Sequence, residues 1–178
     1  MRALRYILAA IVPLCVLLWM PARPALILAL GDEARLAARP VDPRDLFRGD
    51  YVALSFEAEN MPLSAFSLLP FISLNPIHPH EGDVFYISLK KDDGKDGSGL
   101  HVPTMVTSAP PPNGLYLRAR VGSHSYRGDS VPMDLGPSLK RFYVPEGTGL
   151  RLERAGRLAV TVRVWRGEAV IVSADAAL

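Results

Sequence analysis

The residues best suited to chemistry lie in one short charged segment, Pro40–Phe56, whose sequence is PVDPRDLFRGDYVALSF. Carboxylate and guanidinium groups form short, charge-assisted contacts when a turn brings them together. A pair of carboxylates is also what glycoside hydrolysis requires, and Asp45 with Asp50 or Glu146 would form such a pair. The catalytic role of each residue stays unknown. The candidate functional residues are Asp42, Arg44, Asp45, Arg48, Gly49, Asp50, Tyr51 and Glu146.

The same segment has a purely structural interpretation. Asp42-Pro43 starts a turn, Gly49 can adopt a positive φ, and Asp50 can hydrogen-bond its own backbone. Tyr51 and the alternating residues after it then enter a strand. Because turn geometry alone explains these residue types, the sequence favours a fold-stabilising role over catalysis.

The histidines are the next candidates for chemistry. His78 and His80 flank Pro79, and His101 or His124 would complete a zinc or copper site. The His-x-His spacing is common by chance, however, and Pro79 fixes the local geometry without making the two rings converge. Surface-loop histidines are the favoured interpretation. We therefore expect no metal site and no cofactor, with His78 and His80 as weak metal candidates.

Other motifs with chemical meaning fail on inspection. Gly-Asp before an alternating strand also occurs in signal-peptidase-like β folds, but the sequence has no Ser-Met dipeptide and carries lysine only at positions 90, 91, 95 and 140. Arg-Gly-Asp occurs at Arg48–Asp50 and Arg127–Asp129, and we expect adhesion from neither. There is no Walker loop, dinucleotide fingerprint, Cys-x-x-Cys or basic stripe with interleaved aromatics, so a nucleic-acid partner is not expected.

Mostly β-strands must position these residues. From Glu33 to Leu178, short runs alternate apolar and polar residues between Gly, Pro, Asn and Asp. Arg166-Gly167 predicts a two-residue hairpin turn, and the charged, Gly-rich stretch 91–99 predicts the tip of a second hairpin. The expected strands are Ala34–Ala38, Tyr51–Glu57, Val84–Lys90, Val102–Thr107, Leu115–Val121, Arg141–Val144, Leu158–Arg166 and Glu168–Ser173.

One apolar, proline-rich stretch, Met61–Glu81, interrupts this rhythm. It predicts either a long loop or broken helix covering one end of the sheet, or a surface that meets a membrane or a partner. Helix is expected elsewhere only in an N-terminal anchor and near Thr148–Ala155. The predicted fold class is mainly β: an N-terminal transmembrane helix followed by a small antiparallel β barrel or sandwich-like domain with a Pro-rich insertion.

The N-terminal residues 1–22 predict a membrane anchor. Tyr6–Ala22 contains 17 uncharged residues, which span about 25 Å as a helix. Arg2 and Arg5 precede this run and predict a cytoplasmic N-terminus. Small residues suited to signal cleavage are missing just after the run, so we expect the anchor to be retained. The sole cysteine, Cys15, lies inside it, which leaves the exported part without a disulfide.

Two units follow from this pattern: a cytoplasmic stub and anchor at 1–22, and an extracytoplasmic β-rich domain at 23–178. The expected location is the inner (cytoplasmic) membrane, with a single span and the C-terminal domain in the periplasm. The whole chain has 20 basic and 18 acidic residues, and two of the basic residues precede the anchor. The exported domain is therefore formally neutral, and the basic charge indicates topology rather than a nucleic-acid partner.

Two motifs give the chain a specific resemblance. Gly49-Asp50-Tyr51 followed by Leu54 and an aromatic residue, with Pro40–Leu46 before it, resembles the bacterial GDYXXLXY family. The later run FYVPEG at 142–147, followed by Leu152-Glu153, is similar to that family's second signature. Phe56 stands where the family pattern has a final tyrosine. The resemblance implies a small, membrane-anchored bacterial protein, often encoded beside multi-pass membrane proteins, and it supplies no established activity.

These observations favour one function and leave one alternative open. We expect a membrane-anchored extracytoplasmic binding or accessory domain whose partner is a multi-pass membrane protein. The alternative is an envelope hydrolase that uses the Asp- and Arg-rich turn at 42–50 together with Glu146. The sequence favours the non-enzymatic function because no complete catalytic set is recognisable.

Overall fold

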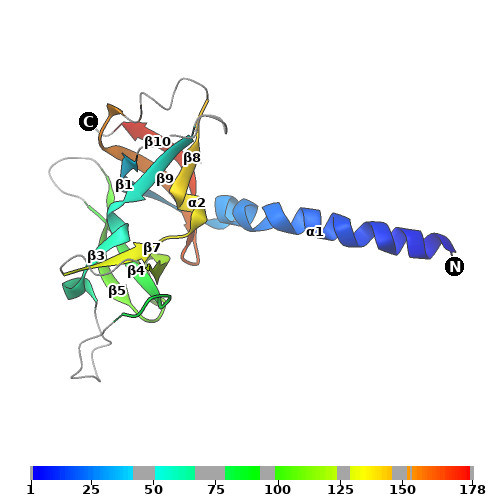
Figure 1. Cartoon of the computed structure of the whole chain (residues 1–178), viewed down its shortest axis with the longest axis horizontal. Coiled ribbons are helices and arrows are strands. Elements are labelled where there is room, and N and C mark those ends of the chain that lie inside the picture. Colours follow the sequence, from blue (N-terminus) through cyan, green and yellow to red (C-terminus); the bar gives the residue numbers. More distant parts are fainter. Residues whose placement is uncertain are drawn as a thin grey trace.

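The computed structural model describes residues 2–41, 51–66, 79–92, 99–123, 129–145, 152 and 154–176. Within this part the chain forms one long N-terminal helix and a β domain, so the predicted mainly β fold is confirmed. Figure 1 shows the helix projecting from the domain, which gathers all the strands at one end of the molecule.

The helix α1 (Arg2–Leu30) is longer than the uncharged run that predicted it, and it contains Pro13, Pro21 and Pro24. Its window Pro13–Leu30 is long and apolar enough to cross a membrane, and only 6% of that window is buried. The low burial separates it from the core helix of a soluble protein, although an N-terminal signal sequence shares the same properties. Prolines are better tolerated in membrane helices than in soluble ones. We treat α1 as a candidate membrane-spanning helix.

All eight expected strands are present, and their ends differ from the predicted ones by at most a few residues. Two short strands, β3 and β7, and one turn of helix, α2 (Pro137–Lys140), were not predicted. The strands are β1 (Asp32–Val41), β2 (Tyr51–Phe56), β3 (Asn60–Pro62), β4 (Val84–Lys91), β5 (His101–Thr107), β6 (Leu115–Val121), β7 (Ser130–Asp134), β8 (Arg141–Tyr143), β9 (Leu158–Trp165) and β10 (Glu168–Ala176).

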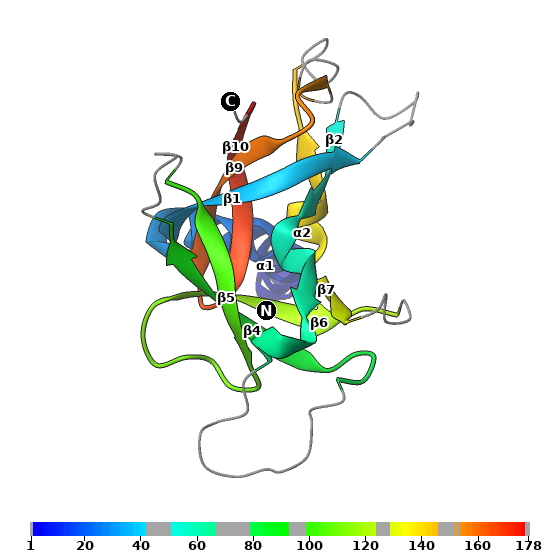
Figure 2. The same ribbon diagram turned by 90° about the vertical axis from the view of Figure 1, so that its left-hand side faces the viewer.

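The sheet branches at β1. One edge of β1 pairs with β9, while the other pairs with β5 at Leu36 and with β2 from Ala38 to Val41. The order continues from β5 through β4, β6 and β7 to β3, with β10 outside β9 and β8 outside β2. Because the short turn η1 (Glu57–Glu59) joins β2 to β3, the sheet curls into a half-barrel. Figure 2 shows β1 crossing the domain in front of α1.

The concave side of this sheet holds the hydrophobic core. Alternate residues of β9 point inward, and Leu158, Val160 and Val162 are completely buried. The facing strands contribute Ile87, Leu117 and other fully buried side chains. Such alternation is what a sheet with one covered face requires. Among the strands of the described residues, every pairing is antiparallel except that of β1 with β5, which is parallel.

The proline-rich insertion is described only at its ends. The turn η2 (Leu63–Ala65) and Phe66 follow β3, and Phe66 bridges Val106 of β5 and packs edge-on against Phe85. This end therefore packs against the sheet, while which of the two predictions holds for the insertion as a whole stays a prediction. Residues 67–78 of the insertion, and residues 148–151 and 153 of the expected second helix, lie outside the described residues.

The predicted hairpin turn between β9 and β10 is confirmed. Arg166 and Gly167 both have positive φ, at 51° and 82°, as a type I′ turn requires. The turn also reaches across to β6, where the Arg118 N–H donates to the Gly167 carbonyl at 2.7 Å. A Cβ on Gly167 would lie 2.9 Å from the Tyr116 ring and 3.0 Å from the Arg118 Cβ, so only glycine fits here.

Gly167→Ala should therefore destabilise the domain for two reasons. Gly82→Ala is the matched control, since Gly82 has φ +89° with nothing within 4 Å of an added Cβ. Both variants suffer the left-handed strain of about 1–2 kcal/mol, but Gly167→Ala adds overpacking of roughly 1–3 kcal/mol. Urea unfolding of the full chain in detergent micelles measures the difference. Equal losses would show that the contact between this turn and β6 can relax.

Candidate functional site

The two sequence motifs meet in the structure. Strand β2, which continues the first motif, pairs antiparallel with β8, which belongs to the second. Tyr51 lies opposite Tyr143, and Val52 lies opposite Phe142. Residues separated by about ninety positions in the sequence therefore form one local unit, with the chain continuing toward both motif turns from the same end of the strand pair.

An exposed group of side chains, here called the aromatic cluster, consists of Tyr51, Arg141 and Tyr143. The Tyr51 and Tyr143 rings lie 6.0 Å apart between centroids and are tilted by 52°. The Arg141 guanidinium lies 5.5 Å from the centre of the Tyr51 ring, a cation–π arrangement. Tyr143 is 66% exposed, so this cluster presents aromatic surface to the outside of the domain.

The inward face of β2 is structural. Val52, Leu54 and Phe56 are buried, with Phe56 only 1% exposed. Phe56 is the position where a tyrosine was expected from the resemblance, and its ring fills the core without any hydroxyl to satisfy. The motif thus divides by strand alternation: one face holds the core together and the other carries Tyr51.

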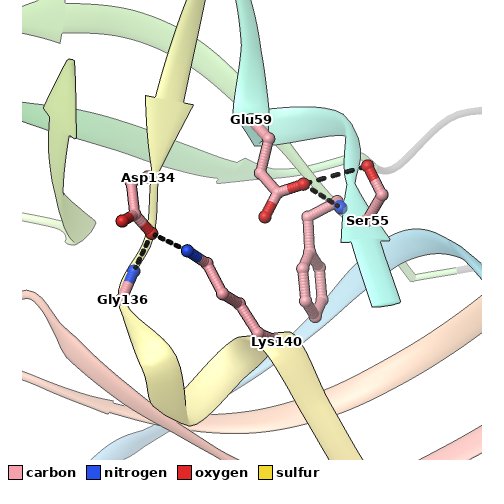
Figure 3. Close-up of polar contacts among 6 residues, drawn as sticks. Ser55, Glu59, Asp134, Gly136 and Lys140 are labelled. Atoms are coloured by element: carbon pink, nitrogen blue, oxygen red, sulfur yellow. Dashed lines mark hydrogen bonds and ion pairs between the residues drawn. The ribbon is translucent and has the colours of Figure 1, made fainter. Parts of the chain in front are cut away.

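A polar group follows directly after β2. Figure 3 shows the half-buried Glu59 carboxylate accepting from the Ser55 hydroxyl at 2.9 Å and from the Phe56 N–H at 3.2 Å. The second contact satisfies the first N–H of turn η1, as the glutamate of a capping box does. Burial raises the pKa of Glu59, although the two hydrogen bonds and the charge of Lys140 oppose this effect.

A second carboxylate, Asp134, lies near Glu59 and has stronger partners. It accepts from Lys140 Nζ at 3.1 Å and from the Gly136 N–H at 2.9 Å (Figure 3). Burial alone would raise the pKa of Asp134, but these hydrogen bonds and the charges of Lys140 and Arg120 together hold it below its usual value. The contact with Lys140 ties α2, just before β8, to the end of β7.

The structure describes few of the residues that the sequence singled out. Of the eight candidate functional residues, Tyr51 alone lies among the described residues, in the aromatic cluster. The motif candidates that fall outside the described residues are Asp42, Arg44, Asp45, Arg48, Gly49, Asp50 and Glu146. Whether their side chains converge therefore stays a prediction.

The histidines are only partly placed, because His78 and His124 lie outside the described residues. His80 is exposed, with its Nδ1 3.8 Å from an Asp83 carboxylate oxygen. His101 accepts the Arg35 N–H at Nδ1, and burial lowers its pKa. Within the described ranges, no three His, Cys, Asp or Glu residues are grouped so that they could hold a metal ion.

Sequence reasoning missed Glu59, Asp134, Lys140 and Arg141. A weak signal existed for Glu59, which lies three residues after Phe56, the aromatic residue at the end of the first motif, and this is the spacing of a capping glutamate. Asp134 lies at the end of a strand that was not predicted. Its contact with Lys140 depends on tertiary placement, for which no local pattern exists.

Replacing Glu59 should change how stability depends on pH. Its folded pKa is above the ordinary value of 4.5, so stability is full below that value and is lost as pH rises through the raised folded pKa. Glu59→Gln keeps an oxygen acceptor for the Phe56 N–H and removes the charge. Relative to Glu59→Gln, the wild-type chain should therefore lose stability as the pH rises above 4.5.

Thermal unfolding of the full chain in micelles at several pH values measures this effect. Glu59→Ala is the control, because it leaves the Phe56 N–H and the Ser55 hydroxyl without their acceptor and should cost about 1–3 kcal/mol even at low pH. Parallel pH profiles for wild type and Glu59→Gln would contradict the assigned cause.

Comparison with known proteins agrees with the motifs. A family model described as GDYXXLXY protein matches residues 13–173, which is nearly the whole chain and extends from within α1 into β10. No curated protein and no solved structure matches. The joined motif strands and the extent of this match show that the chain belongs to the GDYXXLXY family.

Proposed function

We propose that this chain is a membrane-anchored extracytoplasmic binding domain that serves as an accessory subunit of a multi-pass membrane protein. The observation that carries the proposal is the aromatic cluster. Tyrosine and arginine are among the residue types enriched in binding hot spots, and here Arg141 and Tyr143 each contact Tyr51. Rings held in place before binding lose little conformational entropy when a partner covers them.

The anchor gives the reason to expect a partner in the membrane. The helix α1 offers an apolar window for one membrane span, and the arginines at positions 2 and 5 favour a cytoplasmic N-terminus. The β domain would then face the periplasm from the inner membrane. A domain held at the surface by one helix meets other membrane proteins at high effective concentration, so a modest contact surface suffices.

A test places a photoreactive benzoylphenylalanine at position 143 in cells that make the protein natively. Crosslinks from this position should identify one multi-pass membrane protein. The control position is 105, where Met105 is also exposed but lies on β5, away from the cluster. Equal crosslinking from both positions, or repeated recovery of the chain alone, would refute the proposal.

The variants Tyr143→Ala and Arg141→Ala should weaken co-purification of that partner at least about tenfold, because truncating a hot spot costs about 2 kcal/mol or more. Met105→Ala should leave it unchanged. Circular dichroism of each purified variant separates a lost contact from a lost fold.

The envelope hydrolase is a second candidate, favoured by the pairing of β2 with β8. Asp50 directly precedes Tyr51 and Glu146 follows Tyr143 by three residues, and Tyr51 lies opposite Tyr143 in the strand register. A hydrolase of this kind requires two cooperating carboxyl groups. The register supports this candidate because the two acids are neighbours in sequence of residues that pair.

Purified full chain can be assayed against chromogenic esters, phosphoesters and glycosides. If the hydrolase function holds, Asp50→Asn and Glu146→Gln should each lower the rate about 100-fold or more, as loss of a general acid or base does. If the wild-type chain and the two variants give the same rate on every substrate class, the hydrolase function is contradicted.

A further inference from the structure

A cavity of about 640 Å³ lies where α1 enters the β domain. Its walls are the last turns of α1, the outer face of β6, the segment from β7 to α2, and the start of β10. Figure 1 shows α1 leaving the β domain beside α2, on the side of the domain from which the helix extends toward the N-terminus. The volume lies within the range of about 300–1,000 Å³ that is usual for small-ligand sites.

Two arginines on β6 line this cavity. Arg118 and Arg120 are two residues apart on one strand, so their side chains share a face. Both are exposed, whereas Leu117 and Ala119 between and beside them point into the core. Within the described part of the chain, neither guanidinium forms an ion pair with a carboxylate.

The acidic residues of the cavity already have partners. Asp134 is opposite Arg120 in the strand register, but its carboxylate accepts from Lys140 at 3.1 Å and from a backbone N–H. Glu168 pairs with Arg23 at 3.3 Å. The lining holds three arginines and two carboxylates, for a net charge of +1. The guanidinium groups of β6 are therefore available to a ligand with negative charge.

The position of the cavity along α1 indicates which class of anionic ligand it can reach. The uncharged run of the helix ends at Ala22, and the residues of α1 that line the cavity begin at Met20 and include Arg23. Trp19, which is 79% exposed, directly precedes these residues on the N-terminal side. Aromatic residues are enriched at the bilayer interface. If the uncharged run crosses the hydrocarbon core, the cavity lies in the headgroup layer, where lipid phosphates are found.

We infer that this cavity binds the phosphate group of an anionic membrane lipid, with Arg118 and Arg120 as its ligands. Guanidinium groups form bidentate hydrogen bonds with phosphate. The exposed apolar side chains of Leu14, Leu17 and Leu18, on the membrane side of the cavity along α1, provide surface for the adjoining acyl chains. The inference rests on the proposed membrane anchor, although not on the aromatic cluster or its partner.

The test reconstitutes the full chain into nanodiscs of phosphatidylcholine alone or of an equimolar mixture with phosphatidylglycerol. Native mass spectrometry then counts the lipids that stay bound. The wild-type chain should retain one phosphatidylglycerol. The double variant Arg118→Gln with Arg120→Gln should retain it at least about tenfold less, because a hydrogen bond to a charged group is worth about 1.5–3 kcal/mol.

A double variant of Arg39→Gln with Arg154→Gln is the matched control. Both residues are exposed arginines outside the cavity, so this variant removes the same charge and should retain the lipid as the wild-type chain does. Equal loss from the two double variants would show general surface attraction and overturn the inference. Unfolding temperatures measured in phosphatidylcholine nanodiscs confirm that both variants are folded.

Two further measurements separate the remaining outcomes. Inorganic phosphate at millimolar concentration should not displace the lipid, and efficient displacement would mean a free-anion site instead. Carbonate extraction of native membranes should leave the chain in the pellet. Release into the supernatant would overturn the anchor together with the lipid site, whereas a retained chain without bound lipid would overturn the lipid site alone.

Discussion

The arrangement of the whole molecule depends on the hydrogen bonds at Gly31, where α1 ends and β1 begins. The Gly31 N–H donates to the Ile27 carbonyl at 2.9 Å, and the Gly31 carbonyl accepts from Arg163 Nη1 at 2.9 Å. A Cβ at this residue would overlap the Ile27 carbonyl oxygen, so glycine is required. One residue thus joins the candidate membrane helix to the branching strand of the sheet, and no flexible linker separates them.

This junction determines how the β domain is oriented on the helix. Arg163 belongs to β9 and also approaches Glu33 at 3.8 Å, so the helix end, β1 and β9 are held together. The ion pair between Arg23 and Glu168 adds a second point of attachment. Exposed ion pairs contribute about 0–1 kcal/mol, so it matters more for orientation than for stability. If α1 crosses the membrane as proposed, a domain fixed in this way keeps the same face toward the bilayer.

The sequence predicted well whatever depends on local pattern. Alternation identified β4, β6 and β9 nearly to the residue, and Arg166-Gly167 identified the turn between the last two strands. Alternation did not predict β7, because Pro132 lies inside this five-residue strand and proline argues against a strand. The structure tolerates it because the Pro132 carbonyl, which proline keeps, accepts the Gly122 N–H at 2.9 Å.

The candidate site was predictable only in part, for a related reason. Strand alternation within the motif separates buried Leu54 and Phe56 from Tyr51, and this separation can be inferred from sequence. Arg141 and Tyr143, which contact Tyr51 from about ninety residues later in the chain, reach it through the pairing of β2 with β8. No local rule specifies this pairing. Nor does alternation reveal that Arg118 and Arg120 face the anchor, because that depends on where α1 ends.

Net charge and local charge lead to different conclusions about this domain. The part of the chain after residue 22 has equal numbers of acidic and basic residues, so long-range attraction to an anionic membrane is weak. The cavity beside α1 nevertheless carries an excess of one positive charge. A strongly basic domain would be drawn to an anionic bilayer by whichever face is most basic. If α1 spans the membrane as proposed, attraction confined to the cavity beside α1 would leave the orientation to the Gly31 junction and would keep the aromatic cluster uncovered by the bilayer.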